Sequence, residues 1–335
     1  MTSPSLAAAR SRWRVPPRHV PVLATLALLL VMYGVGASQY TAFSNIQVVL
    51  NVFIDNGFLL VVAVGMTFVI LTGGIDLSVG SVVAMTAMVC ASLLRADLPA
   101  PLVLVIALLI GPTLGFVMGC IIHFFEIQPF IVTLAGMFFA RGMCTFISGS
   151  SIPITDRLWT RLAQDRIGDP RGNFVSISVL IAFAVVGIGA YVLAYTRLGR
   201  NVYAIGGNPQ SALLMGLPVA RTRIAVYTIS GLCSAVGGIL LSFYTLSGAP
   251  LIAIGMELDV IAAVVIGGTV LTGGSGYVFG TVLGVLVLGV IQTLITFDGR
   301  LSSWWTKIVI GGLLFAFILL QRLTGATPRA RSAGG

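Results

Sequence analysis

The stretch Ala63-Val-Gly-Met-Thr-Phe-Val-Ile-Leu-Thr-Gly-Gly-Ile-Asp-Leu-Ser-Val-Gly-Ser81 decides the class of fold. Its first half completes an apolar run over 53–72 that is long enough to cross a hydrocarbon core of about 30 Å. Similar runs recur along nearly the whole chain of 335 residues, of which 57% are hydrophobic and only 9% are charged. Soluble domains carry about 25% charged residues. The sequence therefore excludes a soluble protein and predicts an all-α, polytopic membrane protein.

About ten transmembrane helices are predicted. The eighth is short and rich in glycine, which predicts a broken or partial helix. The ten predicted spans lie at 20–37, 53–72, 79–95, 101–124, 130–148, 174–195, 224–246, 258–272, 277–297 and 304–321. The chain thus divides into a tail at 1–19, a transmembrane domain at 20–322 with an external loop at 149–173 and a cytoplasmic loop at 196–223, and a tail at 323–335.

The arginines orient the chain. An even number of spans places both termini on one side, and cytoplasmic segments of membrane proteins are enriched in Lys and Arg. Basic residues precede the first span, gather in the loop at 196–223 and follow the last span, so we expect both termini in the cytoplasm. The external loop at 149–173 departs from the rule because it carries four arginines. The net charge of +9 needs no nucleic-acid partner, since the lipid bilayer accounts for this distribution.

Catalytic groups and metal ligands are not expected. The four cysteines fall in apolar segments, and no CxxC pair or Cys/His cluster occurs. We therefore predict no disulfide, no metal site and no cofactor. His19 and His123 supply no convergent catalytic set, so we do not expect an enzyme.

A short motif recurs along the chain. Leu71-Thr-Gly-Gly74 leads to Gly80-Ser81, and Leu271-Thr-Gly-Gly274 leads to Gly280-Thr281, an offset of 271 − 71 = 200 residues. Transporters often contain internal repeats. We predict an internal duplication whose two copies share an orientation, with chance similarity between two glycine-rich segments as the alternative.

The segment 72–81 combines paired glycines with Asp76 and Ser78. It lacks the lysine of the phosphate-binding motif GxxxxGK[ST], so this chain is not expected to bind or hydrolyse ATP by itself. One interpretation is a helix that is interrupted at membrane depth, where irregular backbone is tolerated against protein or a watery path. The alternative is a tight turn at the membrane surface in which Asp76 caps the next helix.

Other polar residues fall in or beside the predicted spans. Asp55 and Asn56 open the second span, and Arg141 lies in the middle of the fifth. A charge at a helix centre costs about 2.5–3.5 kcal/mol on insertion scales. We therefore expect Arg141 to pair with a carboxylate or with backbone carbonyls, in a structural role. Glu257 and Asp259 precede the eighth span, where a helix N-terminus favours carboxylates in any case.

The loop at 196–223 contains a predicted short helix. Asn208-Pro209 is typical of a helix start, and Gly216 and Pro218 would end the helix. Its apolar residues are more numerous than a free loop needs: Ala212, Leu213, Leu214, Met215 and Leu217. A short exposed apolar helix indicates a docking surface, and a helix folded back onto the membrane is the alternative.

Several of these segments resemble known permeases. The loop is similar to the coupling segment of bacterial ABC importer permeases, with alanine and glycine four positions apart at Ala212 and Gly216, although the usual glutamate is absent. The stretch 63–81 resembles the ribose-type monosaccharide permeases. Three motifs resemble the permeases of galactofuranose importers: Thr133-Leu-Ala-Gly-Met-Phe-Phe-Ala-Arg-Gly142, Tyr203-Ala-Ile-Gly-Gly-Asn208 and Leu301-Ser-Ser-Trp-Trp-Thr-Lys-Ile308. The likeness runs from about residue 20 to 322.

The resemblance implies a permease subunit of an ATP-driven monosaccharide importer in the bacterial inner membrane. It implies three protein partners: a second paralogous permease, cytoplasmic ATP-binding subunits and a periplasmic sugar-binding protein. The residues expected to contact the ATP-binding subunit are Gly206, Gly207, Asn208, Ala212, Leu213, Met215 and Gly216. Ribose, arabinose or another monosaccharide is the alternative to galactofuranose.

Roles for the remaining polar residues follow from this resemblance. Carboxylates and hydroxyls match sugar hydroxyls, so the candidates for the sugar path are Asp76, Ser78, Asn56 and Asp55. Arg157 and Arg161 of the external loop are candidates for docking the binding protein. An ion-coupled secondary transporter, with Asp76 or Asp55 as the coupling acid, is the rival function. Against this rival, the apolar loop at 205–217 has no purpose without a docking partner.

Overall fold

The computed structural model describes residues 20–168, 172–300, 302 and 304–323, so the predicted tails up to 19 and beyond Leu323 lie outside the described residues. The helices are α1 (Val20–Gln39), the 3-10 helix η3 (Thr41–Ser44), α2 (Ile46–Leu71), α3 (Val79–Arg95), α4 (Ala100–Phe124), α5 (Pro129–Ile147), α6 (Arg157–Gln164), α7 (Ile177–Tyr195), α8 (Arg197–Gly207), α9 (Pro209–Leu214), α10 (Val219–Thr245), α11 (Met256–Ile266), α12 (Val278–Asp298) and α13 (Trp304–Leu323). The strands are β1 (Ile152–Pro153), β2 (Arg166–Gly168), β3 (Phe174–Ser176) and β4 (Ser247–Gly248).

Each of the ten predicted spans has a helix as its counterpart, which confirms the all-α membrane fold. Within the described ranges, eight helices are long and apolar enough to cross a membrane: α1, α2, α4, α5, α7, α10, α12 and α13. The third span corresponds to α3, of 17 residues, and the eighth to α11, of 11 residues. The short eighth helix is therefore confirmed. It ends at Ile266 rather than at 272, because two glycines follow and Gly268 has a φ of +93°.

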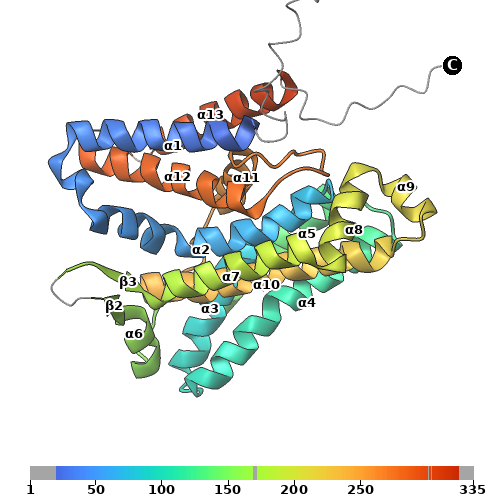
Figure 1. The fold of residues 1–335 in the computed structure, drawn as a ribbon. Coiled ribbons are helices and arrows are strands. Elements are labelled where there is room, and N and C mark those ends of the chain that lie inside the picture. The colour runs from blue at the N-terminus through green and yellow to red at the C-terminus, as the bar shows by residue number, and fades with distance from the viewer. Residues whose placement is uncertain (1–19, 169–171, 301, 303, 324–335) are drawn as a thin grey trace, which may run out of the picture.

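The bundle has two distinct ends (Figure 1). Helices α8 and α9 lie at one end, whereas α6 and the strands β2 and β3 lie at the other. The Thr25 hydroxyl, near the start of α1, donates to the Ile266 carbonyl, and the Gln321 amide, near the end of α13, donates to the Val265 carbonyl at 3.1 Å. The start of α1 and the end of α13 therefore lie beside the C-terminal end of α11.

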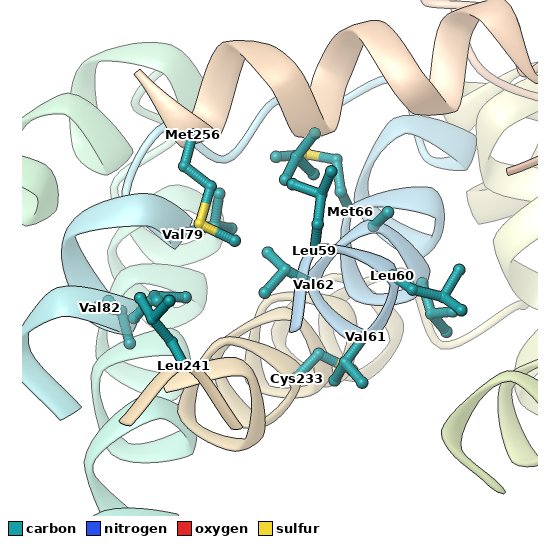
Figure 2. Packing of buried hydrophobic residues seen from close by; sticks show 14 of the residues in the cluster. Leu59, Leu60, Val61, Val62, Met66, Val79, Val82, Cys233, Leu241 and Met256 are labelled. Carbon is teal, nitrogen blue, oxygen red and sulfur yellow. The ribbon is translucent and has the colours of Figure 1, made fainter. Parts of the chain in front are cut away.

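The core lies where α2, α3, α10 and α11 meet. Helix α2 is the most enclosed of the eight long helices. Figure 2 shows Met256 of α11 beside Val79 of α3, with Leu59 and Val62 of α2 close by. Because Val79 begins α3 and Met256 begins α11, two shortened helices start side by side against the middle of α2. A non-helical segment precedes each of them, 72–78 before α3 and 249–255 before α11.

Helices α4 and α10 cross closely and run antiparallel. Gly111 lies against the Gly231 backbone, Gly115 against Tyr227, and Gly119 against Ile224. Without side chains at these three positions the two backbones approach each other, as is usual between membrane helices.

The predicted external loop at 149–173 contains the helix α6 and the strands β1 and β2. Asp169, Pro170 and Arg171 lie outside the described residues. Strands β1 and β4 pair antiparallel, with Ile152 opposite Gly248, and β2 pairs with β3. Trp159 of α6 is fully buried, and its indole N–H donates to the Ser242 hydroxyl at 3.0 Å. A buried tryptophan with a satisfied N–H fixes α6 on the end of α10.

Candidate functional site

Helix α9 presents an apolar surface at the α8 end of the bundle. The Asn208 side chain accepts a hydrogen bond from the Ser211 N–H at 2.9 Å, and Pro209 occupies the first turn. These two residues start the helix as the sequence predicted. Gly216, with a φ of +74°, follows the helix end. Leu213, Leu214 and Met215 are exposed, Leu214 to 89%, and these three residues form what we call the α9 surface.

Other residues of the same segment hold α9 in place rather than face outward. Ala212 is buried in a small cluster with Ile205 and Val219. The Tyr203 hydroxyl of α8 donates to the Gly276 carbonyl at 2.8 Å. Burial raises the pKa of Tyr203 to about 12, so the hydroxyl keeps its proton and remains a donor at physiological pH. These contacts of Ala212 and Tyr203 hold α8 and α9 against the rest of the bundle, so the position of the α9 surface is fixed.

The two copies of the repeated motif meet beside α8. The Gly274 N–H donates to the Leu71 carbonyl at 2.9 Å, and a Cβ on Gly273 would lie 2.7 Å from the Gly73 nitrogen. Gly206 of α8 fits between them, because a Cβ there would overlap the Leu71 carbonyl oxygen. We call the segments 71–74, 206–207 and 272–274 the glycine junction. Gly206 thus lies inside this junction, whereas a Cβ on Gly207 would meet no atom within 4 Å.

Asp76 and Ser78 lie together in a buried polar network. Asp76 is 1% exposed, and one of its carboxylate oxygens accepts from the Ser78 N–H at 3.0 Å and from the Ser78 hydroxyl at 2.6 Å. The other oxygen accepts from the Ser230 hydroxyl at 2.7 Å. Ser230 is near the middle of α10, so the segment 72–78 is buried against that helix, while the bond to the Ser78 N–H also places Asp76 as a cap at the start of α3. The Tyr227 hydroxyl beside Gly74 has no partner among the described residues.

The other two candidates for the sugar path lie apart from this network. Asn56 is buried between α2 and α12, where its amide donates to the Val52 carbonyl at 2.9 Å. Asp55 is exposed and accepts from the Tyr244 hydroxyl at 3.2 Å. In this conformation the four residues do not converge on one cavity, and their role in the path stays a prediction.

Arg141 binds backbone carbonyls, one of the two partner types that we expected. Its guanidinium donates to the carbonyl oxygens of Pro250 at 3.1 Å and Ile252 at 2.7 Å. These carbonyls belong to the non-helical segment 249–255 that leads into α11. Arg141 of α5 therefore supplies donors that this irregular backbone lacks.

Arg157 and Arg161 lie on α6, at the end of the bundle opposite α9 (Figure 1). Both side chains are exposed, and neither has a charged or hydrogen-bonding partner within the described ranges. Together with Thr155, Gln164 and Asp165 they line a shallow depression of about 420 Å³. Two unpaired cations on an ordered helix form a surface that suits an acidic partner.

Sequence reasoning missed Ser230 and Lys307. Ser230 pairs with Asp76, and Lys307 of α13 forms an ion pair with Asp259 of α11. A serine inside an apolar run carries no signal of its own. Lys307 is a cation near the start of a predicted span, which is a signal that could have singled it out.

Comparisons with known proteins agree on one family. The family model described as "Branched-chain amino acid transport system / permease component" matches residues 48–318. The chain is 47% identical over 310 residues to the inner membrane ABC transporter permease protein YjfF of Escherichia coli K12, covering 91% of this chain and 92% of that protein. It is 40% identical over 327 residues to the fructose import permease protein FruG of Bifidobacterium longum, covering 96% of each.

A third relative is the ribose import permease protein RbsC of Escherichia coli K12. It is 36% identical over 300 residues, which cover 89% of this chain and 92% of that protein. No solved structure matches the chain.

Proposed function

The chain belongs to the family of branched-chain amino acid transport system permease components, and from this premise we propose that it is the membrane permease subunit of an ABC importer for a monosaccharide. The observation that carries this proposal is the near end-to-end match to relatives named as fructose and ribose import permeases. Although the family description refers to branched-chain amino acids, those two relatives are named for sugars. The exposed α9 surface supports dependence on a separate ATPase.

The orientation that we propose, with the α9 end in the cytoplasm, rests on the basic residues at that end. Arg197 and Arg200 of α8 and Arg221 and Arg223 of α10 flank α9 in the sequence, and basic residues of this kind favour the cytoplasmic side. The start of α1 and the end of α13 both lie beside the C-terminal end of α11, at Val265 and Ile266. The two ends of the transmembrane domain are therefore on the same side, which supports cytoplasmic termini. In this orientation α6 faces the periplasm.

The α9 surface is the contact that we propose for the ATP-binding subunit. An ATPase that closes on nucleotide can move the membrane helices only through a firm contact, and α9 is fixed by Asn208, by its buried Ala212 and by the glycine junction beside it. Three consecutive large apolar side chains in water are otherwise unfavourable. Leu213 and Met215 therefore keep the role that the sequence suggested, and Leu214 joins them.

The experiment that tests the function is purification and uptake with the genetically neighbouring transport subunits. Leu214→Asp should release the ATPase subunit or lower ATP-driven sugar uptake at least tenfold. Leu158→Asp, an exposed leucine on α6 at the opposite end, is the matched control and should keep the ATPase bound. If Leu214→Asp assembles and transports normally, α9 is not the coupling contact. If the parent complex transports no sugar, the proposed function itself is wrong.

Galactofuranose is the sugar that we propose. The support comes from the motifs at 133–142 and 203–208, which resemble the permeases of galactofuranose importers. The relatives' names quoted above mention fructose and ribose, so these two sugars are the competitors to test. Uptake of labelled galactofuranose that neither ribose nor fructose displaces would support the assignment. Preferential uptake of ribose or fructose would replace it.

The external partner that we propose is a periplasmic sugar-binding protein that docks at α6. Arg157 and Arg161 offer two unpaired cations there, and an acidic surface on the binding protein would complement them. A second, paralogous permease would complete the transmembrane part of the importer. Cross-linking between α6 and the binding protein tests this placement.

The sugar path is proposed to involve Asp76, Ser78, Asn56 and Asp55. Since Asp76 and Ser78 are enclosed in this conformation, their part in the path requires the segment 72–78 to move. An ion-coupled transporter, the rival function, would use the same acids and no ATP. Collapsing the ion gradient with an ionophore in vesicles supplied with ATP separates the two: uptake persists in an ABC importer and stops in an ion-coupled transporter.

A further inference from the structure

One charge pair lies on an exposed face of the transmembrane bundle. The Lys307 ammonium donates to both carboxylate oxygens of Asp259, at 2.7 and 2.5 Å. It is the one side-chain ion pair among the described residues, and its side chains are 49% and 22% exposed. A pair on the outside of an isolated subunit faces lipid, water or another protein in the assembled complex.

With the start of α1 set at the cytoplasmic surface of the bilayer and the helices taken along the membrane normal, helix lengths place the pair near the middle of the membrane. The Ile266 carbonyl, at the end of α11, accepts from Thr25, which lies five residues into α1. At 1.5 Å per residue, Thr25 is about 7–8 Å from the start of α1, and Asp259 is about 10 Å further along α11. These two lengths add to more than half of a hydrocarbon core of about 30 Å. Lys307 must therefore extend from its position near the outer end of α13 toward the interior of the bilayer.

Irregular backbone leads directly into the end of α11 that carries Asp259. Residues 249–255 carry no regular helix, and Arg141 binds two of their carbonyl oxygens. Glu257 and the Ala253 carbonyl lie against Gly80 at the start of α3, so this segment descends well below the outer ends of the helices. Leu251 within this segment and Leu258 just after it are exposed to 72% and 62%.

Lipid is a poor neighbour for this face. Hydrocarbon cannot hydrogen-bond to charged groups or to irregular backbone, which occur at membrane depth only against protein or a water-filled cavity. The half-exposed Lys307 ammonium and the partly exposed Asp259 carboxylate keep unused hydrogen-bonding capacity, which water or a polyol can take up. Resting on the proposed function, we propose that Asp259, Lys307 and the segment 249–255 line a water-filled route for sugar through the bilayer.

The chemistry of the pair fits a neutral polyol. The carboxylate accepts hydrogen bonds from sugar hydroxyls and the ammonium donates to them. Because the two charges neutralise each other, the route carries no net charge at this point, and it has no strong field to retain ions. Sugar hydroxyls replace water around the pair one after another, so passage requires no tight binding site.

Cysteine accessibility tests the placement without depending on transport. Leu258→Cys in a Cys120→Ala background, within the assembled complex, is treated with a charged, membrane-impermeant thiosulfonate. A thiol reacts as thiolate and therefore needs water. Ile188→Cys on α7, with a similar exposure of 63%, is the matched control. Leu258→Cys should react at least tenfold faster. Equal, background rates at both positions would place lipid or a tight protein contact on this face and overturn the proposal.

Replacing the pair by apolar residues tests its function. The double variant Asp259→Leu with Lys307→Met removes both charges, and a purely structural ion pair tolerates such a replacement. We expect the complex to assemble with unchanged ATPase content while sugar uptake falls at least tenfold. Normal uptake by the assembled double variant would contradict a role in the route. Because the parent complex is measured alongside, absence of uptake in the parent would refute the importer function and not this placement.

Discussion

Replacing Asp76 by asparagine keeps the shape of the side chain and removes its charge. The amide oxygen can retain the two hydrogen bonds from Ser78, whose N–H and hydroxyl lie 3.0 and 2.6 Å from the carboxylate. The amide nitrogen must then face the Ser230 hydroxyl, which now donates to the carboxylate at 2.7 Å. That hydroxyl can turn to accept from the amide and donate to a carbonyl of its own helix. The network therefore survives in Asp76→Asn with weaker bonds.

The size of the effect follows from the three bonds. A hydrogen bond to a charged group contributes about 1.5–3 kcal/mol and a neutral one about 0.5–1.5 kcal/mol. Each weakened bond therefore loses about 1–1.5 kcal/mol, and the three together lose about 3–4.5 kcal/mol. Removing the buried charge returns a desolvation energy of several kcal/mol. The two terms offset each other, and we expect Asp76→Asn to assemble with a thermal midpoint close to that of the parent.

Asp76→Ala is the informative contrast. It leaves the two donors of Ser78 and the hydroxyl of Ser230 without their acceptor. Each buried, unpaired group costs about 1–3 kcal/mol, so the loss is about 3–9 kcal/mol in total and assembly should suffer. Thermal unfolding of the purified complex measures this difference. If Asp76→Ala were as stable as the parent, the account of the network would be wrong.

Sugar uptake per assembled complex then separates the two roles of Asp76. A path or gating role predicts at least tenfold lower uptake in Asp76→Asn, because the neutral amide is a weaker acceptor for hydroxyls. A purely structural role predicts uptake in proportion to the amount of folded complex. The assay uses proteoliposomes with the ATP-binding and sugar-binding partners present. Normal uptake in a fully assembled Asp76→Asn complex would leave only the structural role.

Three other substitutions test the packing and the docking surface. Gly206→Ala should lower the thermal midpoint of the complex, because the new Cβ would overlap a carbonyl oxygen of α2 at a cost of about 1–3 kcal/mol or more. Gly207→Ala is the control, because its new Cβ would meet no atom within 4 Å. Gly111→Ala should destabilise the complex in the same assay, because its Cβ would overlap a carbonyl oxygen of α10. Replacing both Arg157 and Arg161 by Glu should slow docking of the sugar-binding protein, as measured by stopped-flow. The effect should be larger at low salt, where charges are less screened, and modest in size because exposed pairs contribute about 0.2–1 kcal/mol each. An unchanged docking rate at low salt would contradict this role.

Local features of the sequence predicted the class of fold and several elements. Apolar runs long enough to span a membrane identify the helices, because the bilayer requires an apolar surface of fixed length. The short eighth helix followed from its glycines, and the start of α9 followed from Asn208 and Pro209, whose effects act within one turn. The end of α11 at Ile266 and the start of α10 at Val219 were less well predicted. Apolar residues continue past Ile266, whereas the apolar run of α10 begins only after Val219.

The relations between distant segments were decided by the tertiary structure. The sequence showed that Leu71-Thr-Gly-Gly74 recurs, but only the fold places both copies against Gly206. The sequence singled out Asp76 as a candidate for the sugar path, yet its partner Ser230 lies 154 residues away, and Lys307 lies 48 residues from Asp259. Hydrophobic length and capping are local properties that each segment carries by itself. The partner of a buried polar group depends on which helices cross at its depth, and that is fixed only when the whole bundle assembles.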